Sequence, residues 1–454
     1  MTNGSYNDAY GYNALSTNTS AQRNVAIGYN ALSTFNVTTQ TDTYNTAVGN
    51  LAGTAVTTGI QNTIIGGLAG DALTDSDFNA VVGYAALSSD TLGSHSTAIG
   101  YAALNTQNFT TATNSYNTAV GSSAGVAITT GTQNTLIGSL AGDAITTGIQ
   151  NVALGMGAFG AATDADYNVA IGAYTLDADT LGSNTVAVGY GALTTQNFTT
   201  ATNTHNTAVG HLAGTAVTTG ISNTFIGGLA GDASTDADSN TGVGYNSLST
   251  NVLGTGSTAV GSGALWAQNP ATAVSMYNTA VGFDAGNAIS TGTQNTFVGG
   301  LAGDATDDGA ENTAVGYMAL SGNCGNSNTG IGRQALLVTT GANNTGLGKS
   351  AGVNISSGSN NMLLGVDAGY TGSPGGNITT GSNEIVLGDE NITESHIQVD
   401  WTIASDERDK TDFTALDLGL DFVKALAPVT YKWDKRSKYG DKTADDYDLN
   451  DQTP

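Results

Sequence analysis

A five-residue unit, Asn-x-x-x-Gly, recurs from residue 7 to residue 388 of this 454-residue chain and dominates its organisation. Aligned on its glycine, the unit occurs 22 times, and most neighbouring glycines are 17 residues apart. Four intervals are 21 residues long, those that end at Gly49, Gly121, Gly210 and Gly282. A short fixed period is typical of a solenoid, in which each repeat forms one turn of a coil.

Each unit has the pattern of one short strand followed by a turn. Val, Ile or Leu precedes the glycine directly in 21 of 22 copies, and Thr or Val stands two residues earlier in most copies. The period of two places both positions on one face of a strand, where β-branched side chains suit the pleated surface. We expect the pre-glycine aliphatic position to face inward. We expect the small residues beside it, such as Ala47 and Ala98, to form a flat face that packs against identical chains.

Seventeen residues are too few for a strand, a helix and a second strand, which excludes a βαβ unit. The predicted fold class is therefore all-β, a parallel β-solenoid (β-roll) of about 22 coils with a 17-residue repeat. At about 4.8 Å per coil, such a rod is on the order of 100 Å long. Because so thin a coil has little interior of its own, we expect three copies to associate around an axis.

The glycine and asparagine positions have predicted backbone roles. The glycine is expected to take a positive φ or to admit a neighbouring backbone at the corner of the coil. Asn fills its position in 18 of 22 copies, and the exceptions are Ser96, Thr185, Ser257 and Glu384. Stacked side-chain amides form hydrogen-bonded ladders, so the asparagine is expected to be structural.

The charge of the chain is strongly negative and unevenly distributed. A formal net charge of -26 argues against nucleic acid or anionic membrane as partners. Of 11 Lys and Arg residues, only Arg23, Arg333 and Lys349 precede residue 401, which places a domain boundary near residue 400. Cys324 is the single cysteine, so no intrachain disulfide is expected. Neither an export signal nor a run of 18 apolar residues is present in the sequence.

Units such as Asn168-Val-Ala-Ile-Gly172 and Asn45-Thr-Ala-Val-Gly49 resemble the head repeats of trimeric autotransporter adhesins. In that family the repeat forms a left-handed parallel β-roll, and three rolls associate into a head that binds extracellular ligands. The resemblance covers roughly residues 7 to 388, and it implies a trimeric, adhesive shaft. The repeat of this chain is longer than that of the family, which leaves the handedness of the coil open.

A different composition follows the repeats. Residues 389–404 are predicted to form an extended bridge, and residues 405–454 a small α+β piece with a helix over 419–426 and a strand over 429–433. Ser405-Asp-Glu-Arg-Asp-Lys410 and the later Pro428-Val-Thr-Tyr-Lys-Trp433 resemble the intramolecular chaperone domain of phage tail fibres and endosialidase tailspikes. That family's domain is longer, so we expect residues 405–454 to be its N-terminal part, in truncated form.

The resemblance to the chaperone domain implies one self-cleavage event. It assigns Ser405 as the nucleophile, Lys410 as its general base, and Ala404-Ser405 as the bond that is cut. Asp406 and Arg408 would orient these groups or balance their charge. A lysine acts as a base only where burial lowers its pKa, and closure of a trimer would supply that burial. The alternative for these residues is structural, with Ser405 and Asp406 capping a turn and Lys410 in solvent.

Other chemistry is poorly supported by the sequence. Gly155-Met-Gly-Ala-Phe-Gly160 matches a dinucleotide fingerprint, yet it lies inside a repeat without the strand-to-helix context. Acidic turns such as Asp71/Asp75/Asp77 suit Ca²⁺ in principle, but solvated turns are the favoured interpretation. The four histidines match no metal spacing. We therefore predict no cofactor, no metal site and no substrate turnover.

The predicted organisation is a solenoid shaft over residues 1–388, a bridge over 389–404, and part of a chaperone domain over 405–454. The predicted function is a structural or host-adhesive segment of a bacteriophage tail fibre, a homotrimer located in the virion. Its partners would be other tail or baseplate proteins and a host receptor, with a glycan among the candidates. The four 21-residue intervals are the candidate surface knobs. The alternative is the passenger domain of a bacterial trimeric surface adhesin.

Overall fold

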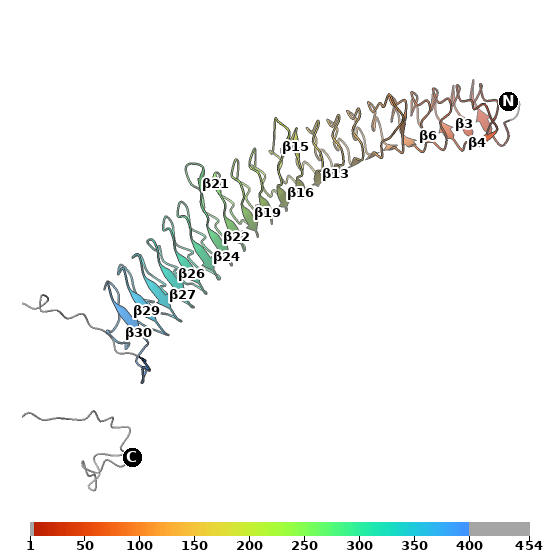
Figure 1. The fold of residues 1–454 in the computed structure, drawn as a ribbon. Coiled ribbons are helices and arrows are strands. Elements are labelled where there is room, and N and C mark those ends of the chain that lie inside the picture. The colour runs from red at the N-terminus through yellow and green to blue at the C-terminus, as the bar shows by residue number, and fades with distance from the viewer. Residues whose placement is uncertain (1–3, 399–454) are drawn as a thin grey trace, which may run out of the picture. The chain divides into compact units, whose positions relative to one another are not determined.

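The structure is a computed structural model, and it describes residues 4–398. The chain divides into two compact units, Met1–Thr393 and Glu394–Pro454, and the fold described below belongs to the first. This unit is a stack of similar turns that follow one another along a single column (Figure 1). Among the described residues the regular structure is β-strand throughout, without any helix.

Twenty-two strands of three residues form one continuous parallel sheet along the stack. They are β1 (Asp8–Tyr10), β3 (Val25–Ile27), β5 (Thr46–Val48), β6 (Thr63–Ile65), β7 (Ala80–Val82), β9 (Thr97–Ile99), β11 (Thr118–Val120), β12 (Thr135–Ile137), β13 (Val152–Leu154), β14 (Val169–Ile171), β16 (Val186–Val188), β18 (Thr207–Val209), β19 (Thr224–Ile226), β20 (Thr241–Val243), β22 (Thr258–Val260), β24 (Thr279–Val281), β25 (Thr296–Val298), β26 (Thr313–Val315), β27 (Thr329–Ile331), β28 (Thr345–Leu347), β29 (Met362–Leu364) and β30 (Ile385–Leu387). Each strand pairs in register with that of the next turn, as Thr46 pairs with Thr63. The predicted parallel β-solenoid is confirmed, with about 21 complete turns.

Eight strands of two residues form four small parallel pairs beside the main sheet. They are β2 (Ala21–Gln22) with β4 (Thr41–Asp42), β8 (Gly93–Ser94) with β10 (Thr113–Asn114), β15 (Gly182–Ser183) with β17 (Thr202–Asn203), and β21 (Gly254–Thr255) with β23 (Val274–Ser275). In each pair the second strand belongs to a 21-residue interval and the first to the turn before it. The four insertions are thus attached to the shaft in one common way.

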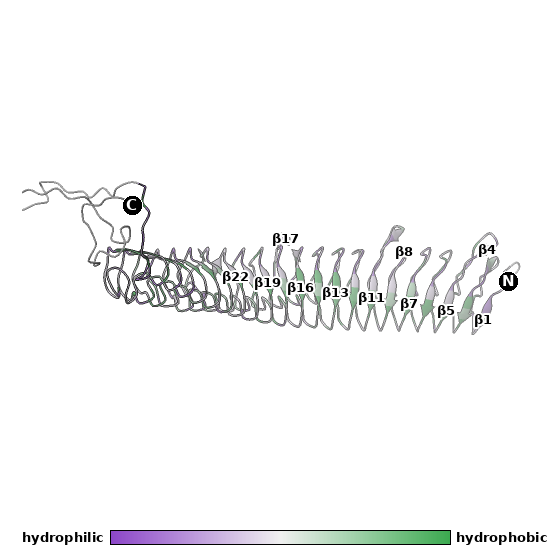
Figure 2. Ribbon diagram, turned by 90° about the horizontal axis from the view of Figure 1, so that it is seen from below, coloured by the Kyte–Doolittle hydropathy of each residue, from purple (hydrophilic) through white to green (hydrophobic). Residues whose placement is uncertain are grey.

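The interior of the solenoid is lined by the middle residue of each three-residue strand. Ala26 and Ile64 are fully buried, whereas the pre-glycine residues Ile27 and Ile65 are 40% and 39% exposed. The prediction that the pre-glycine aliphatic position faces inward is therefore wrong. The small residues such as Ala47 and Ala98 are buried inside the turn and do not form an outer face. Figure 2 shows the hydrophobic colouring on strands such as β13 and β16.

The thinness of the turn explains this reversal. Residues −3 and −1 from the glycine share one face of the strand and residue −2 takes the other, because successive side chains alternate. Inside each turn, residue −2 shares the narrow interior with buried residues from the loop that follows the glycine, such as Ala31 and Leu32. An alanine fits there in most turns, so the larger aliphatic side chains lie outside.

Side-chain size is balanced within individual turns. Where Phe225 and Phe297 occupy the inner strand position, Gly231 and Gly303 stand opposite them in the same turns. A Cβ atom on Gly231 would lie 2.3 Å from Cε1 of Phe225, and one on Gly303 would lie 2.6 Å from Cζ of Phe297. These glycines make room for the two rings, as close packing of protein interiors requires.

The glycine that ends each strand forms a column in which backbones touch. Gly66 has φ 140°, and a Cβ atom placed on it would lie 2.3 Å from the carbonyl oxygen of Gly83 in the next turn. The same close approach recurs from turn to turn, for example at Gly138 and Gly227. The predicted positive φ and close backbone neighbour are both confirmed.

The asparagine position forms a buried ladder, as predicted. The Oδ1 atom of Asn117 accepts hydrogen bonds from the backbone N–H of Asn134 at 2.9 Å and from its Nδ2 at 3.3 Å. The Nδ2 of Asn134 also donates to the carbonyl oxygen of Gly148 at 2.9 Å. Each amide therefore links its own turn to the turn before and holds the loop that follows, so the column satisfies buried polar groups along the shaft.

The size balance predicts the effect of adding one methyl group. Gly231→Ala should lower the free energy of unfolding by about 1–3 kcal/mol, because its Cβ overlaps the ring of Phe225. Gly157→Ala is the matched control, because Gly157 has φ 60° beside 58° at Gly231, and the nearest neighbour of its Cβ would be the exposed ring of Tyr174 at 3.2 Å. Thermal unfolding followed by circular dichroism measures both. Equal melting temperatures for the two variants would contradict the packing described here.

Candidate functional site

The residues predicted to carry chemistry lie outside the described part of the chain. Ser405, Asp406, Arg408 and Lys410 belong to this group, as does the Ala404-Ser405 bond. The predicted helix and strand within residues 419–433 lie there too. The candidate sites within residues 4–398 are surfaces of the shaft.

One face of the shaft exposes aliphatic side chains along its whole length. The pre-glycine column contributes most of them, with residues 36–47% exposed at positions such as Ile99, Leu154, Ile226 and Leu347. Since neighbouring turns cover the flanks of each side chain, this exposed fraction points outward. A column about 100 Å long and about 5 Å wide amounts to roughly 500 Å², which is as large as the greatest apolar patch on a typical monomer. We call the outward face of the 22-stranded sheet the strand face.

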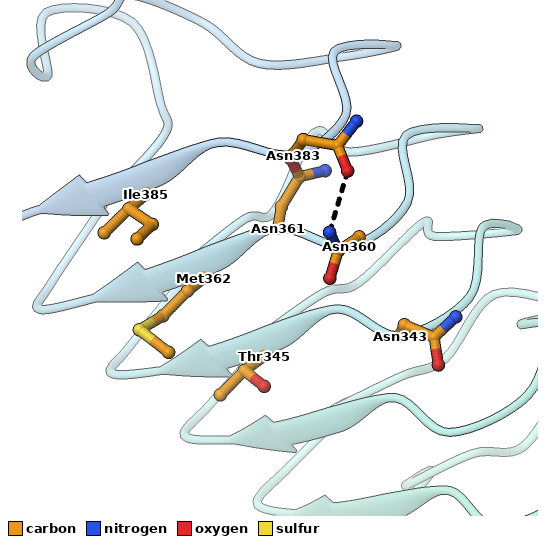
Figure 3. A pocket seen from close by; sticks show the side chains of 7 residues that line it. All are labelled: Asn343, Thr345, Asn360, Asn361, Met362, Asn383 and Ile385. Carbon is orange, nitrogen blue, oxygen red and sulfur yellow. Dashed lines mark hydrogen bonds between the residues drawn. The ribbon is translucent and has the colours of Figure 1, made fainter. Parts of the chain in front are cut away.

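Figure 3 shows the strand face near the end of the shaft. Thr345, Met362 and Ile385 lie one above another on β28, β29 and β30, and they line a depression of about 250 Å³. Three asparagines, Asn343, Asn360 and Asn383, complete its rim, and Nδ2 of Asn360 donates to Oδ1 of Asn383 at 2.7 Å. Met362 and Ile385 are 43% and 64% exposed, so the apolar character of the face reaches the last turn.

Aromatic side chains stack along both edges of the strand face. On the edge before the asparagine ladder, His95 lies between Phe78 and Tyr116, with ring centroids 4.9 and 5.1 Å apart. On the edge after the glycine column, Tyr84 and Tyr101 are stacked with centroids 5.9 Å apart. Stacking between turns adds roughly 0.5–1.5 kcal/mol per pair beyond burial, so these columns reinforce the register of the coil.

At three positions where the ladder lacks an asparagine, a glutamine from the following 21-residue interval accepts the hydrogen bond that the missing asparagine would accept. Ser96, Thr185 and Ser257 occupy the ladder position just before the second, third and fourth insertions. There the buried side chain of Gln107, Gln196 or Gln268 accepts a hydrogen bond from the next asparagine, as Gln107 Oε1 does from Asn117 Nδ2 at 2.8 Å. Three of the four exceptions in the repeat are therefore compensated by a glutamine from a 21-residue interval.

Two of these glutamines are held by buried carboxylates. Asp90 accepts from Gln107 Nε2 at 2.6 Å and from the backbone N–H groups of Gly93 and Phe109 at 3.0 and 3.1 Å. Asp179 repeats the arrangement with Gln196, and both aspartates are fully buried. Burial raises the pKa of each carboxyl, and the hydrogen bonds from the glutamine and the backbone oppose that rise.

The fourth insertion shows what the aspartate supplies. Asn251 stands where the other turns have Asp90 and Asp179, and its side chain bonds only to Gly254. As a result, Nε2 of Gln268 is buried without a hydrogen-bond partner. Sequence reasoning missed this network. Its signal is a missing ladder asparagine followed 11 residues later by glutamine, and this pattern recurs at the second, third and fourth insertions.

The acidic turns are occupied by contacts within the shaft. Asp75 accepts from the hydroxyl of Thr58 at 2.5 Å, and Asp77 accepts from the backbone N–H of Ile60 at 2.7 Å. Asp238 makes the corresponding contact with Ile221 at 2.7 Å. Among residues 4–398, no group of three His, Cys, Asp or Glu side chains is arranged to hold a metal ion. These aspartates join successive turns of the shaft.

Residues 4–398 contain no helix that could span a membrane.

The raised pKa values predict how acid changes the stability of the insertions. A carboxyl whose pKa is raised by folding stabilises the fold fully below its ordinary value of 3.8, and this contribution is lost as the pH rises through the folded pKa. The double variant Asp90→Asn and Asp179→Asn should therefore gain less stability on acidification than the parent chain. Melting temperatures measured from pH 7 to pH 4 test this. The variant Asp75→Asn, at an exposed turn, is the control. A constant difference between parent and double variant across this pH range would contradict the prediction.

Comparison with known proteins places the last segment in a family. Residues 405–448 match the family model described as "Chaperone of endosialidase". No curated protein and no solved structure matches the chain. Chaperone domains of this kind are typical of phage tail fibres and tailspikes, which are trimeric. The chain therefore combines a long parallel β-solenoid with a C-terminal domain of the chaperone of endosialidase family, found in self-processing phage tail proteins.

Proposed function

We propose that this chain is a structural, host-contacting segment of a bacteriophage tail fibre that assembles as a homotrimer and carries a self-cleaving C-terminal chaperone. The strand face is the observation that supports this proposal most directly. A shaft in solution that exposes a continuous aliphatic column along more than twenty turns has a surface suited to burial. The family match at residues 405–448 supports the phage setting and the virion location.

The interior of the shaft explains why a single chain benefits from association. Most inner strand positions hold alanine, whose methyl group contributes only about 0.8 kcal/mol on burial. The aliphatic groups that precede the glycines lie on the strand face, and they gain their full stabilisation only when another surface covers them. Three chains that turn their strand faces toward a common axis would cover all of these columns at once and in an equivalent way.

A charge on the strand face tests this assembly. Ile137→Glu places a carboxylate in the exposed aliphatic column of β12, where burial against partner chains would leave it unpaired. We expect the trimer to be lost while the circular dichroism spectrum of the solenoid is retained. Light scattering after size-exclusion chromatography measures the mass. Thr130→Glu, on an exposed loop of the same turn, should remain a trimer. A trimeric Ile137→Glu variant, or a monomeric parent chain, would exclude the proposed interface.

For the C-terminal domain we propose that Ser405 attacks the carbonyl carbon of Ala404 while Lys410 accepts the proton of the hydroxyl. The peptide bond gives way to an ester, and water then hydrolyses that ester. One water molecule is consumed, which leaves a carboxylate on Ala404 and an amine on Ser405. Asp406 and Arg408 would orient the reacting groups, and trimer closure would bury Lys410 enough to lower its pKa.

Mass spectrometry of the full-length gene product tests the self-cleavage. We expect the parent protein to yield a fragment ending at Ala404, and Ser405→Ala to remain uncut. Lys410→Met should also remain uncut, because it removes the base but keeps the serine. Ser382→Ala, an exposed serine of the shaft, is the control and should be cut normally. An uncut parent protein, or cleavage of Ser405→Ala at the same bond, would exclude this mechanism.

A further inference from the structure

The last turns of the shaft depart from the 17-residue period and enclose a second depression. The glycines at 316, 332 and 348 are 16 residues apart, and the interval from Gly365 to Gly388 has 23 residues. Here a depression of about 320 Å³ opens on the surface. Its walls are formed by Gln334, Ser350, Val353, Asn354, Asp367 and Tyr370.

The walls of this depression are well supported by the backbone. Gln334, Ser350 and Asp367 stand in one column, and their N–H groups donate to the turns before them at 2.8–2.9 Å. Tyr370 begins the longer loop of the 23-residue interval. That loop is held by the buried Ser373, whose Oγ accepts from the N–H of Gly369 at 3.0 Å and donates to the carbonyl of Gly376 at 3.2 Å. The depression is thus a product of the irregular turns.

The lining has the chemistry of a site for hydroxyl groups. The carboxamides of Gln334 and Asn354 both donate and accept hydrogen bonds, and the hydroxyl of Ser350 does the same. The carboxylate of Asp367 adds an acceptor. The ring of Tyr370, which is 43% exposed, and the methyl groups of Val353 provide apolar surface. Four of the six lining residues are polar or charged, which suits a ligand rich in hydroxyl groups.

Two cations stand beside the depression. Arg333 and Lys349 directly precede the lining residues Gln334 and Ser350, so their Cα atoms are about 3.8 Å from those of the lining. Both side chains are exposed, and neither forms an ion pair with a described carboxylate. They are two of the three basic residues that precede residue 401, while the chain as a whole carries a net charge of -26. The long stem of an arginine or lysine can carry its charge several ångströms from the Cα atom.

We infer that this depression binds a saccharide unit that bears a carboxylate. The sugar hydroxyls would bond to Asp367, Asn354 and Gln334, its apolar face would lie against Tyr370, and its carboxylate would face Arg333 and Lys349. The depression lies beyond the glycine corner, off the strand face, so the proposed trimer leaves it open. This inference rests on the proposed host contact and names the chemistry of the receptor.

Titration of the intact chain with two methyl glycosides, followed by NMR, tests the inference. Methyl β-glucuronide should bind at least several-fold more tightly than methyl β-glucoside, which has the same ring without the carboxylate. Tyr370→Ala combined with Asp367→Asn should weaken glucuronide binding at least tenfold. Tyr245→Ala, which removes an exposed tyrosine elsewhere on the shaft, should not change it. Arg333→Gln combined with Lys349→Gln should remove the preference for the glucuronide.

Each contrary result would overturn the inference. Absence of glucuronide binding to the parent chain, equal affinity for the two glycosides, or unchanged binding by the lining variant would each exclude a site for an acidic sugar here. Binding of the parent chain to host cells is measured separately with fluorescently labelled protein. Cell binding that the lining variant retains would exclude this site and leave the proposed host contact standing. Absence of cell binding by the parent chain, beside glucuronide binding, would instead exclude the host contact.

Discussion

The close contact of backbones along the glycine column is the constraint on which the rest of this structure depends. A Cβ atom at Gly28, Gly83 or Gly261 would lie 2.2 Å from a carbonyl oxygen of the next turn, so no other residue fits without displacing the stack. This contact sets adjacent turns at the spacing of paired strands. Once that spacing is fixed, equivalent positions lie directly above one another, and each side-chain column extends along the shaft. The asparagine ladder, the alanine interior and the aromatic stacks all follow from this alignment.

The same alignment explains why the shaft has a narrow apolar interior and leaves many aliphatic side chains on its surface. An inner alanine occupies the narrow space between the two sides of a turn, and a phenylalanine enters only where Gly231 or Gly303 makes room. The Val, Ile and Leu side chains that precede the glycines lie on the strand face, where a single chain leaves them partly exposed. The turn is also costly in backbone conformation, because residues such as Phe78, Ala85 and Leu87 have φ between 49° and 61°. Such left-handed residues cost on the order of 1 kcal/mol each. Burial of the strand face between chains would offset part of this cost.

The sequence predicted the periodic part of this fold well and its orientation poorly. The period placed the strands, the positive φ of the glycines and the buried asparagines correctly, because each of these is a property of one repeated position. The period could not show which face of a three-residue strand points inward, because alternation is equally compatible with either face. The larger side chains were therefore assigned to the core, which was the wrong choice. The pairing of Gln107 with Ser96 and Asp90 was also missed. That network joins residues from two successive turns, and only the stacking brings them together.

The turns that depart from the 17-residue period differ from the others in their surface. A regular solenoid offers the same narrow strip of surface at every turn, which suits self-association but distinguishes no ligand. Each 21-residue interval adds a short strand that pairs with the turn before it, and Gln107 and Gln196 of two such intervals bind the buried carboxylates of Asp90 and Asp179. The irregular turns after Gly316 bring Gln334, Ser350 and Asp367 together with the loop at Tyr370. Regular turns therefore extend the shaft and provide a repeated surface for assembly. Changes in turn length create hollows lined by polar groups, which the recognition of a ligand requires. Selectivity in such a shaft depends on a few irregular turns, which can vary in sequence without disturbing the columns that hold the rod together.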